Sequence, residues 1–174
     1  MPVYENTFSQ AQKMLQNLDR WLTKAEEHAA AKKFDPSVLI QARLAPDQYP
    51  LVRQVQAACD AAKFLAARLA GKTAPAHPDT ETTFAELHTR IRAVMEYIGG
   101  FSAEDFKGGE ERTVPLGFMP GKGLVGSDYM VEMALPNFYF HTCMAYAILR
   151  HNGVELGKID YIGSLNLIDV PAAS

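Results

Sequence analysis

The chain has 174 residues, of which 48% are hydrophobic and 21% are charged, and its formal net charge is −3. This length and apolar content are typical of one globular domain with a full core, expected over residues 1–174. The basic residues are scattered rather than gathered in a stripe, so we expect no nucleic-acid partner. No apolar run approaches the length of a membrane span and the first segment lacks a signal-peptide pattern, so we expect a cytoplasmic protein without membrane contact.

Apolar residues that recur every three or four positions predict two long amphipathic helices in the first half of the chain. The first spans about residues 7–32 and is ended by Asp35-Pro36. The second spans about residues 47–70, with Gly71 as its C-cap candidate. A long connection separates the two helices, and this length argues against a plain up-down-up-down bundle with tight turns.

Three charged residues surround the predicted start of the second helix, namely Arg43, Asp47 and Arg53. One interpretation is a salt-bridge network that holds the connection against the bundle. The other is a pocket mouth at which Arg43 and Arg53 recognise an anionic ligand, because arginine suits carboxylates. The residues alone leave both interpretations open.

Two further helices are predicted in the second half of the chain. A third helix opens with Thr83 and Glu86, which have the spacing of a capping box, and ends at Gly99-Gly100. Residues 112–118 suggest a short β-hairpin. A fourth helix follows over about residues 127–152, and Pro136 either kinks or restarts it. From Phe138 to Leu149 it is apolar nearly all round, which indicates burial on every side.

Four polar side chains are expected to lie together between the second and fourth helices. His141 is the one titratable residue within the apolar run, and Asn137 lies one turn before it on the same face. Gln56 and Asp60 share a face of the second helix. The first interpretation is a buried hydrogen-bonded network. The alternatives are a weak metal site with His141 and Asp60 as ligands, or a general base formed by His141 beside the Asp60 carboxylate.

These four helices predict an all-α four-helix bundle with its pocket between facing helices. Three segments of the sequence are distinctive enough for a comparison with known families. They are RLAPDQYPLVRQVQAACDAAKFLAARLAG, DTETTFAELHTRI and LPNFYFHTCMAYAILRHNGVELGK. They resemble the bacterial family known as domain of unknown function 1993, a branch of the DinB/YfiT-like superfamily of metal-dependent four-helix bundles. The resemblance therefore implies a DinB-like bundle over nearly the whole chain.

The resemblance also bears on metal binding. Metal-binding members of the superfamily use three histidines, one from the second helix and two, four residues apart, from the fourth. The matching positions here hold Ala57, Asn137 and His141. The resemblance thus implies that the metal triad is largely lost, and zinc or nickel stays only as an alternative cofactor.

Three functional hypotheses follow. The leading one is a bacterial DinB-like protein whose polar inter-helix pocket binds a small molecule without a cofactor. The second is a metal-dependent transferase or hydrolase with a substituted ligand set around His141. The third is a structural homodimer without a ligand. A homodimer is also the assembly expected for the protein in general. Whether the protein is an enzyme stays open at this point.

Overall fold

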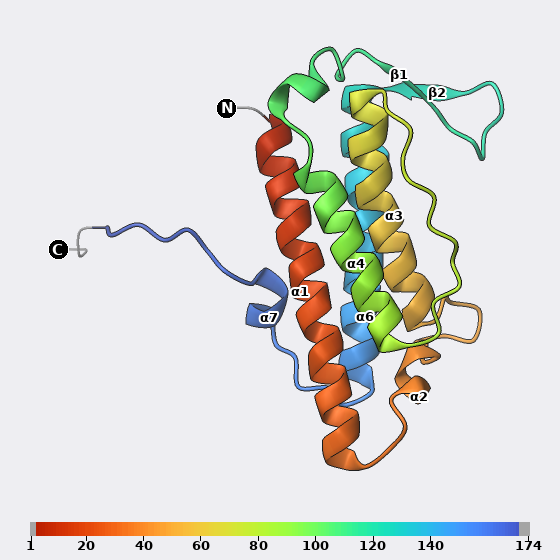
Figure 1. The fold of residues 1–174 in the computed structure, drawn as a ribbon, viewed down its shortest axis with the longest axis vertical. Helices are drawn as coiled ribbons and strands as arrows, with labels where there is room; N and C mark the ends of the chain where they lie inside the picture. The colour runs from red at the N-terminus through yellow and green to blue at the C-terminus, as the bar shows by residue number, and fades with distance from the viewer. Residues whose placement is uncertain (1–2, 171–174) are drawn as a thin grey trace.

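In the computed structural model, which describes residues 3–170, four long helices lie side by side and form an elongated bundle (Figure 1). The elements in chain order are α1 (Val3–Lys32), α2 (Ser37–Ile40), α3 (Leu51–Ala70), α4 (Phe84–Gly99), η1 (Ala103–Phe106), β1 (Thr113–Pro115), β2 (Gly123–Val125), α5 (Gly126–Asp128), η2 (Tyr129–Ala134), α6 (Leu135–His151) and α7 (Lys158–Ile162). The prediction of an all-α four-helix bundle with a short hairpin is confirmed, and β1 pairs antiparallel with β2.

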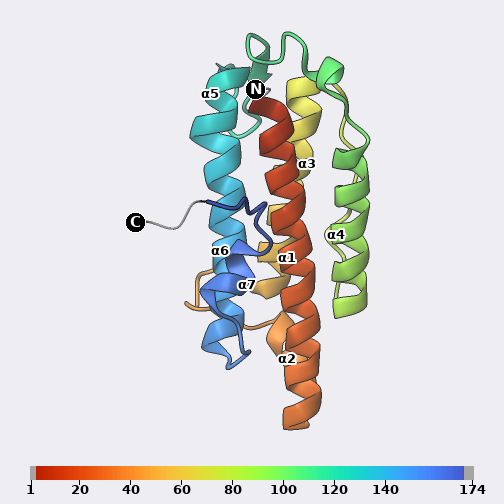
Figure 2. The same ribbon diagram turned by 90° about the vertical axis from the view of Figure 1, so that its left-hand side faces the viewer.

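The long helices are not arranged as successive hairpins. Helix α3 packs against both α4 and α6, and α1 packs against the same two helices from the other side (Figure 2). Helices α3 and α4 run in the same direction, opposite to α1 and α6 (Figure 1). Residues 71–83, here called the strap, therefore return along the length of the bundle between the end of α3 and the start of α4. The predicted long connection, residues 33–50, contains the short helix α2.

Local chemistry explains where the helices begin and end. Helix α3 begins four residues later than predicted, because Pro50 is its extended N-cap. It ends at Gly71, which has a left-handed φ of 67° that glycine adopts without strain. The predicted capping box is present at the start of α4, where the Thr83 side chain accepts from the Glu86 amide and the Glu86 carboxylate accepts from the Thr83 amide.

The predicted fourth helix continues through Pro136. Proline lacks an amide hydrogen, and its ring crowds the carbonyl one turn earlier. The backbone accommodates it by widening into the π-helical segment η2, from Tyr129 to Ala134, directly before α6. The helix is therefore neither ended nor restarted. Such π-helical segments are frequent at functional sites.

One face of α6 is exposed, so the prediction that this helix is buried on every side is wrong. Phe138 and Ala145 are buried against the other helices, but Pro136 is exposed and the Phe140 side chain is 52% exposed. Helix α6 packs on α3 and α1, and Tyr161 of α7 contacts its Cys143 and Tyr146 side chains. The apolar composition of α6 thus exceeds what its neighbours in one chain bury.

The hairpin end of the bundle is fixed by a close backbone approach. A Cβ atom on Gly126, at the start of α5, would lie 1.8 Å from the Gly109 carbonyl oxygen. The Ser127 amide also donates to the Glu110 carbonyl oxygen at 3.0 Å. Only glycine permits this contact, which holds the hairpin over the ends of α3 and η2.

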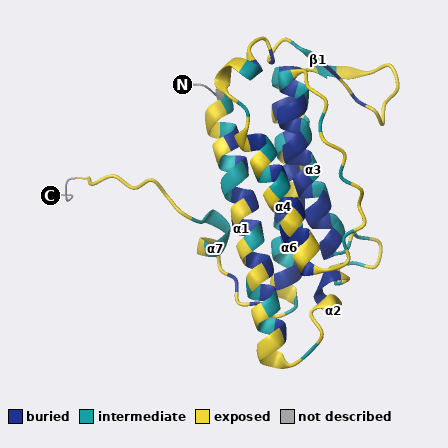
Figure 3. Cartoon of the chain, viewed as in Figure 1, coloured by how far each residue is buried: buried dark blue, intermediate teal, exposed yellow. Residues whose placement is uncertain are grey.

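Apolar residues from all four long helices form a continuous core (Figure 3). Both cysteines are free thiols, and Cys59 is fully buried within this core. His88 is also buried, between the carboxylates of Asp19 and Glu26 on α1, which lie 2.5 and 3.1 Å from its ring nitrogens. Within the described part of the chain, no helix is both long enough and apolar enough to cross a membrane.

Candidate functional site

A pocket of about 300 Å³ opens between α3 and the η2–α6 helix. Its lining combines charged, amide and aromatic side chains. The main contributors are Tyr49, Arg53, Ala57, Asp60, Phe64, Arg68, Asp79, Phe118, Tyr129, Met133 and Asn137. We call this cavity the α3–α6 pocket, and it lies between the two helices predicted to carry the site.

Three structural features shape the α3–α6 pocket. On α3, Ala57, Phe64 and Arg68 are spaced by seven and four residues, so they share one face. The π-helical segment η2 places Tyr129 and Met133 along the pocket. The loop between β1 and β2 adds Phe118, which is exposed at the rim.

The four predicted site residues do not form one network. His141 is buried, but its Nδ1 pairs with Gln54 Oε1 at 2.8 Å rather than with Asp60. Asp60 Oδ1 accepts from Lys63 Nζ at 2.7 Å and from Arg90 at 2.9 Å. Helix rotation explains the difference, because Gln54 rather than Gln56 points toward α6.

Gln56 and Asn137 also take other positions than expected. Gln56 is buried on the opposite side of α3, where its amide donates to Glu81 and its carbonyl oxygen accepts from Arg53, both at 2.8 Å. Asn137 is exposed and lines the α3–α6 pocket, as does Asp60. The pocket therefore contains two of the four predicted residues and excludes the other two.

The hydrogen bonds of Gln54 fix the state of His141. The Gln54 amide donates to the Tyr49 carbonyl oxygen at 3.1 Å, so its Oε1 must accept from His141 Nδ1–H. Burial lowers the pKa of His141, and the positive charge of Arg53 lowers it further. The lowered pKa favours the neutral ring, and the contact with Gln54 places its proton on Nδ1. Its Nε2 forms no hydrogen bond within residues 3–170.

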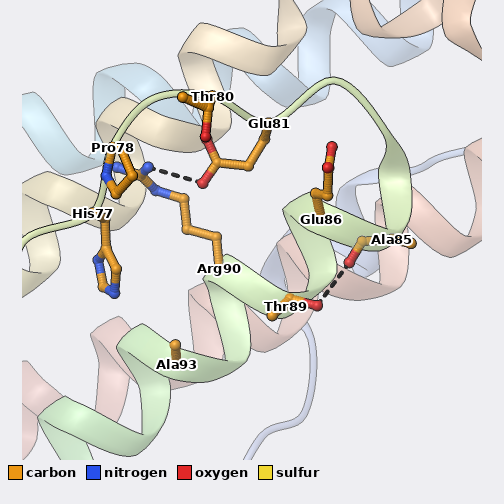
Figure 4. A pocket seen from close by; sticks show the side chains of 9 residues that line it. All are labelled: His77, Pro78, Thr80, Glu81, Ala85, Glu86, Thr89, Arg90 and Ala93. Carbon is orange, nitrogen blue, oxygen red and sulfur yellow. Dashed lines mark hydrogen bonds and ion pairs between the residues drawn. The ribbon is translucent and has the colours of Figure 1, made fainter.

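An ion-pair cluster lies behind the pocket and anchors the strap. The Arg90 side chain is 1% exposed and contacts the carboxylates of Asp60, Asp79 and Glu81 at 2.9–3.0 Å. Figure 4 shows the bond from Arg90 of α4 to Glu81 of the strap. Arg53 pairs with the same Asp79. Burial opposes ionisation of Asp79, but these two arginines lower its pKa overall.

Lys63 and His77 extend this cluster. The Lys63 ammonium is buried, and besides Asp60 it contacts His77 Nδ1 of the strap at 3.2 Å. An ammonium can only donate, so the His77 nitrogen accepts. Burial lowers the pKa of His77, and the charges of Lys63 and Arg90 lower it further. The neutral histidine thus completes the attachment of the strap.

The charge cluster predicted at the start of the second helix is not formed. Arg43 is exposed and donates to the Pro46 carbonyl oxygen of its own loop at 3.4 Å, without an ion pair to Asp47. Arg53 instead faces the strap and lines the α3–α6 pocket. Of the two predicted anion-recognition residues, only Arg53 lies at the site.

The residues at this site do not fit a bound metal ion. His141, Asp60 and Gln56 are directed to three different partners, and Asp60 is neutralised by two buried cations. Zinc favours several histidine or cysteine ligands, whereas the two imidazoles near this site, His141 and His77, contact Gln54 and Lys63 instead. Within residues 3–170, no group of three His, Cys, Asp or Glu side chains is placed to hold a metal ion.

The fold and pocket can now be compared with known proteins. The family model described as Domain of unknown function (DUF1993) matches residues 3–162. The chain belongs to the DUF1993 family. A crystal structure of a DinB family member protein from Shewanella denitrificans shares 48% sequence identity with it and has a TM-score of 0.93, covering 97% of this chain and 96% of that one. No curated protein matches. The DinB-like bundle predicted by resemblance is therefore confirmed.

Two positions at which the resemblance implies superfamily metal ligands lie in the pocket of this DUF1993 protein. Ala57 and Asn137, which stand where the resemblance places histidines, both line the α3–α6 pocket. A second hollow of about 390 Å³ lies between the strap and α4 (Figure 4). It is bordered by Ala85, Thr89 and Ala93, and its Arg90 and Glu81 are already paired with each other. The α3–α6 pocket is therefore the better candidate site.

Sequence reasoning missed Gln54, Arg68 and Tyr129. Arg68 follows Phe64 by four residues and Ala57 by eleven, so a second helical stripe on α3 was present in the sequence. Tyr129 carried no comparable signal, because its direction depends on the π-helical widening before Pro136.

Proposed function

We propose that this DUF1993 protein binds a small molecule in the α3–α6 pocket without a metal ion. The observation that carries the proposal is the composition of the lining. Aromatic and apolar side chains share the lining with two arginines, two aspartates and one asparagine, so the pocket can contact both the apolar body and the polar groups of a small molecule. The volume of about 300 Å³ suits a ligand no larger than a small aromatic metabolite. The adjoining π-helical segment η2 also supports a functional role.

The experiment is an amide-detected NMR titration with three neutral aromatic fragments, phenylacetamide, indole and benzyl alcohol. We expect at least one to shift amide signals of residues that line the pocket. In Ala57→Phe, the new ring fills the pocket and the shifts should disappear. Ala30→Phe, on an exposed position of α1, is the matched control. Shifts that map elsewhere, or that persist in Ala57→Phe, would refute the proposal.

A second proposal concerns assembly, and it is favoured by exposed apolar surface. We propose that two copies associate through the outward face of α6, which exposes Phe140, and through residues 163–170, here called the arm. The arm leaves the bundle after α7 and extends away from it (Figures 1 and 3). Its apolar side chains are Leu165, Leu167, Ile168 and Val170, which are 60–84% exposed.

A second copy is the occupant that suits both surfaces. An apolar helix face and an apolar arm lie on the same chain, so a two-fold arrangement can place each arm on the α6 helix of the other copy. The base of the arm is fixed, because Lys13 donates to the Ser164 carbonyl oxygen at 3.1 Å. Placing each arm on the α6 helix of the other copy therefore needs no change in the bundle itself.

Sedimentation velocity over a range of protein concentrations tests this assembly. We expect a dimer for the wild type and a monomer for Phe140→Ser and for Leu167→Ser/Ile168→Ser. The control is Val38→Ser, an exposed apolar position on α2. A wild type that stays monomeric at the highest concentration, or variants that stay dimeric, would contradict it.

A further inference from the structure

Arg68 stacks on two aromatic rings at the wall of the α3–α6 pocket. Its guanidinium carbon lies 5.0 Å from the centre of the Phe64 ring and 5.3 Å from that of the Tyr129 ring. Its Nη1 donates to the Tyr129 hydroxyl oxygen at 3.0 Å. Arginine stacked on aromatic rings keeps its other N–H groups free for planar acceptors. The side chain is thus positioned by ring stacking and one hydrogen bond to Tyr129, and its remaining N–H groups can bind an anion.

Arg68 is also the basic residue of this region that has no acidic partner. The pocket and the cluster behind it contain four basic residues, Arg53, Lys63, Arg68 and Arg90, and three acidic ones, Asp60, Asp79 and Glu81. The ion pairs among these residues all use Arg53, Lys63 or Arg90 as the cation, and none of them includes Arg68. Within residues 3–170, Arg68 forms no ion pair with any carboxylate. The region therefore has one uncompensated positive charge, located at Arg68.

We infer that the ligand of this pocket carries a carboxylate or phosphate group on an aromatic body, and that Arg68 binds the anionic group. The inference rests on the proposed binding function and specifies its ligand class. A guanidinium offers paired N–H donors that match both types of anion. Tyr49, Phe118 and Met133 provide the walls for the aromatic body.

The other arginine at the pocket is less suited to this role. Arg53 already pairs with Asp79 and donates to Gln56 at 2.8 Å. An anion at Arg53 would have to displace a carboxylate, whereas an anion at Arg68 would neutralise a free charge. Asp60 and Asp79 also line the pocket, so the anion should bind away from them, at the guanidinium of Arg68.

An NMR titration with three matched probes tests the inference. The probes are phenylacetate, phenyl phosphate and the neutral phenylacetamide. We expect at least one anionic probe to bind the wild type about tenfold or more tightly than phenylacetamide, because a hydrogen bond to a charged group is lost in the amide. In Arg68→Gln the Kd for that anion should rise about 10- to 100-fold, while the Kd for phenylacetamide changes less than about twofold.

The control is Arg92→Gln, which removes an exposed arginine from α4 and should leave all three affinities unchanged. The tighter of the two anionic probes identifies carboxylate or phosphate as the preferred group. Equal affinity for anionic and neutral probes in the wild type would overturn the inference but leave the proposed pocket intact. An anion preference that survives Arg68→Gln and is lost in Arg53→Gln would overturn it as well. If no probe binds in the pocket, both proposals fail.

Discussion

Replacement of Arg90 by methionine should release the strap and destabilise the bundle by about 2–3 kcal/mol. Loss of one partner of a buried ion pair costs about 3–5 kcal/mol when the other is left without compensation. Here the cost is smaller, because two of the three carboxylates keep a cation. Asp60 keeps Lys63, and Asp79 keeps Arg53.

Glu81 is the carboxylate that loses its cation. Its side chain is 11% exposed, and it would keep only the hydrogen bond from the Gln56 amide at 2.8 Å. Methionine preserves most of the volume of the arginine stem, so the remaining loss reports the charge interactions. For a chain of this size the expected loss corresponds to a decrease in Tm of about 5–10 °C.

Urea unfolding followed by circular dichroism measures the loss, with Arg92→Met on the exposed face of α4 as control. Hydrogen exchange adds a local readout, because amides of the strap should exchange faster than those of α3. If Arg90→Met does not fold, Glu81→Gln tests the same contact with an expected loss of about 1 kcal/mol. A loss no larger than that of the control, with an unchanged exchange rate in the strap, would refute the reasoning.

Three further outcomes are expected. The free energy of unfolding should decrease as the pH falls below about 6.5, because the pKa values of His77 and His141 are lowered in the fold and the unfolded chain binds more protons in this pH range. In denaturation curves, His141→Gln should reduce the dependence of the unfolding free energy on pH. Gly126→Ala should cost about 1–3 kcal/mol in the same assay, because its methyl group would collide with the Gly109 carbonyl. Cys59 should resist a thiol reagent in the native protein, since burial raises its pKa to about 12.

Each of these outcomes has a control. His151→Gln, at the exposed end of α6, should preserve the slope with pH. Gly117→Ala should be tolerated, because nothing lies within 4 Å of the added Cβ. Cys143, which is half-buried, should react before Cys59. Opposite results would contradict the burial and contacts from which the predictions were made.

The sequence predicted most of the bundle because helix formation leaves local signals. Apolar spacing located α1 and α3, and the Thr83–Glu86 capping box located the start of α4. Gly71 marked the end of α3, since a left-handed residue favours glycine. The resemblance to a DinB-like family agreed with this pattern and was confirmed over residues 3–162.

The site was predicted less completely, because it depends on how helices rotate about their axes and where a loop crosses them. A rotation of α3 of about half a turn separates Gln54, which meets His141, from Gln56, which faces the strap. Asp60 was predicted to lie beside His141 because it shares a face of α3 with Gln56. In the structure the Asp60 carboxylate instead pairs with Lys63 and Arg90.

Composition and periodicity by themselves determined that this chain folds as a four-helix bundle, because each helix must bury an apolar stripe. Only the tertiary structure decided that α3 and α4 are parallel, that the strap crosses between them, and that Arg68 has no acidic partner. The physical reason is that charged side chains reach partners far apart in sequence. Which carboxylate neutralises which cation is therefore set by packing, and the charge left over at Arg68 could not be found from local patterns.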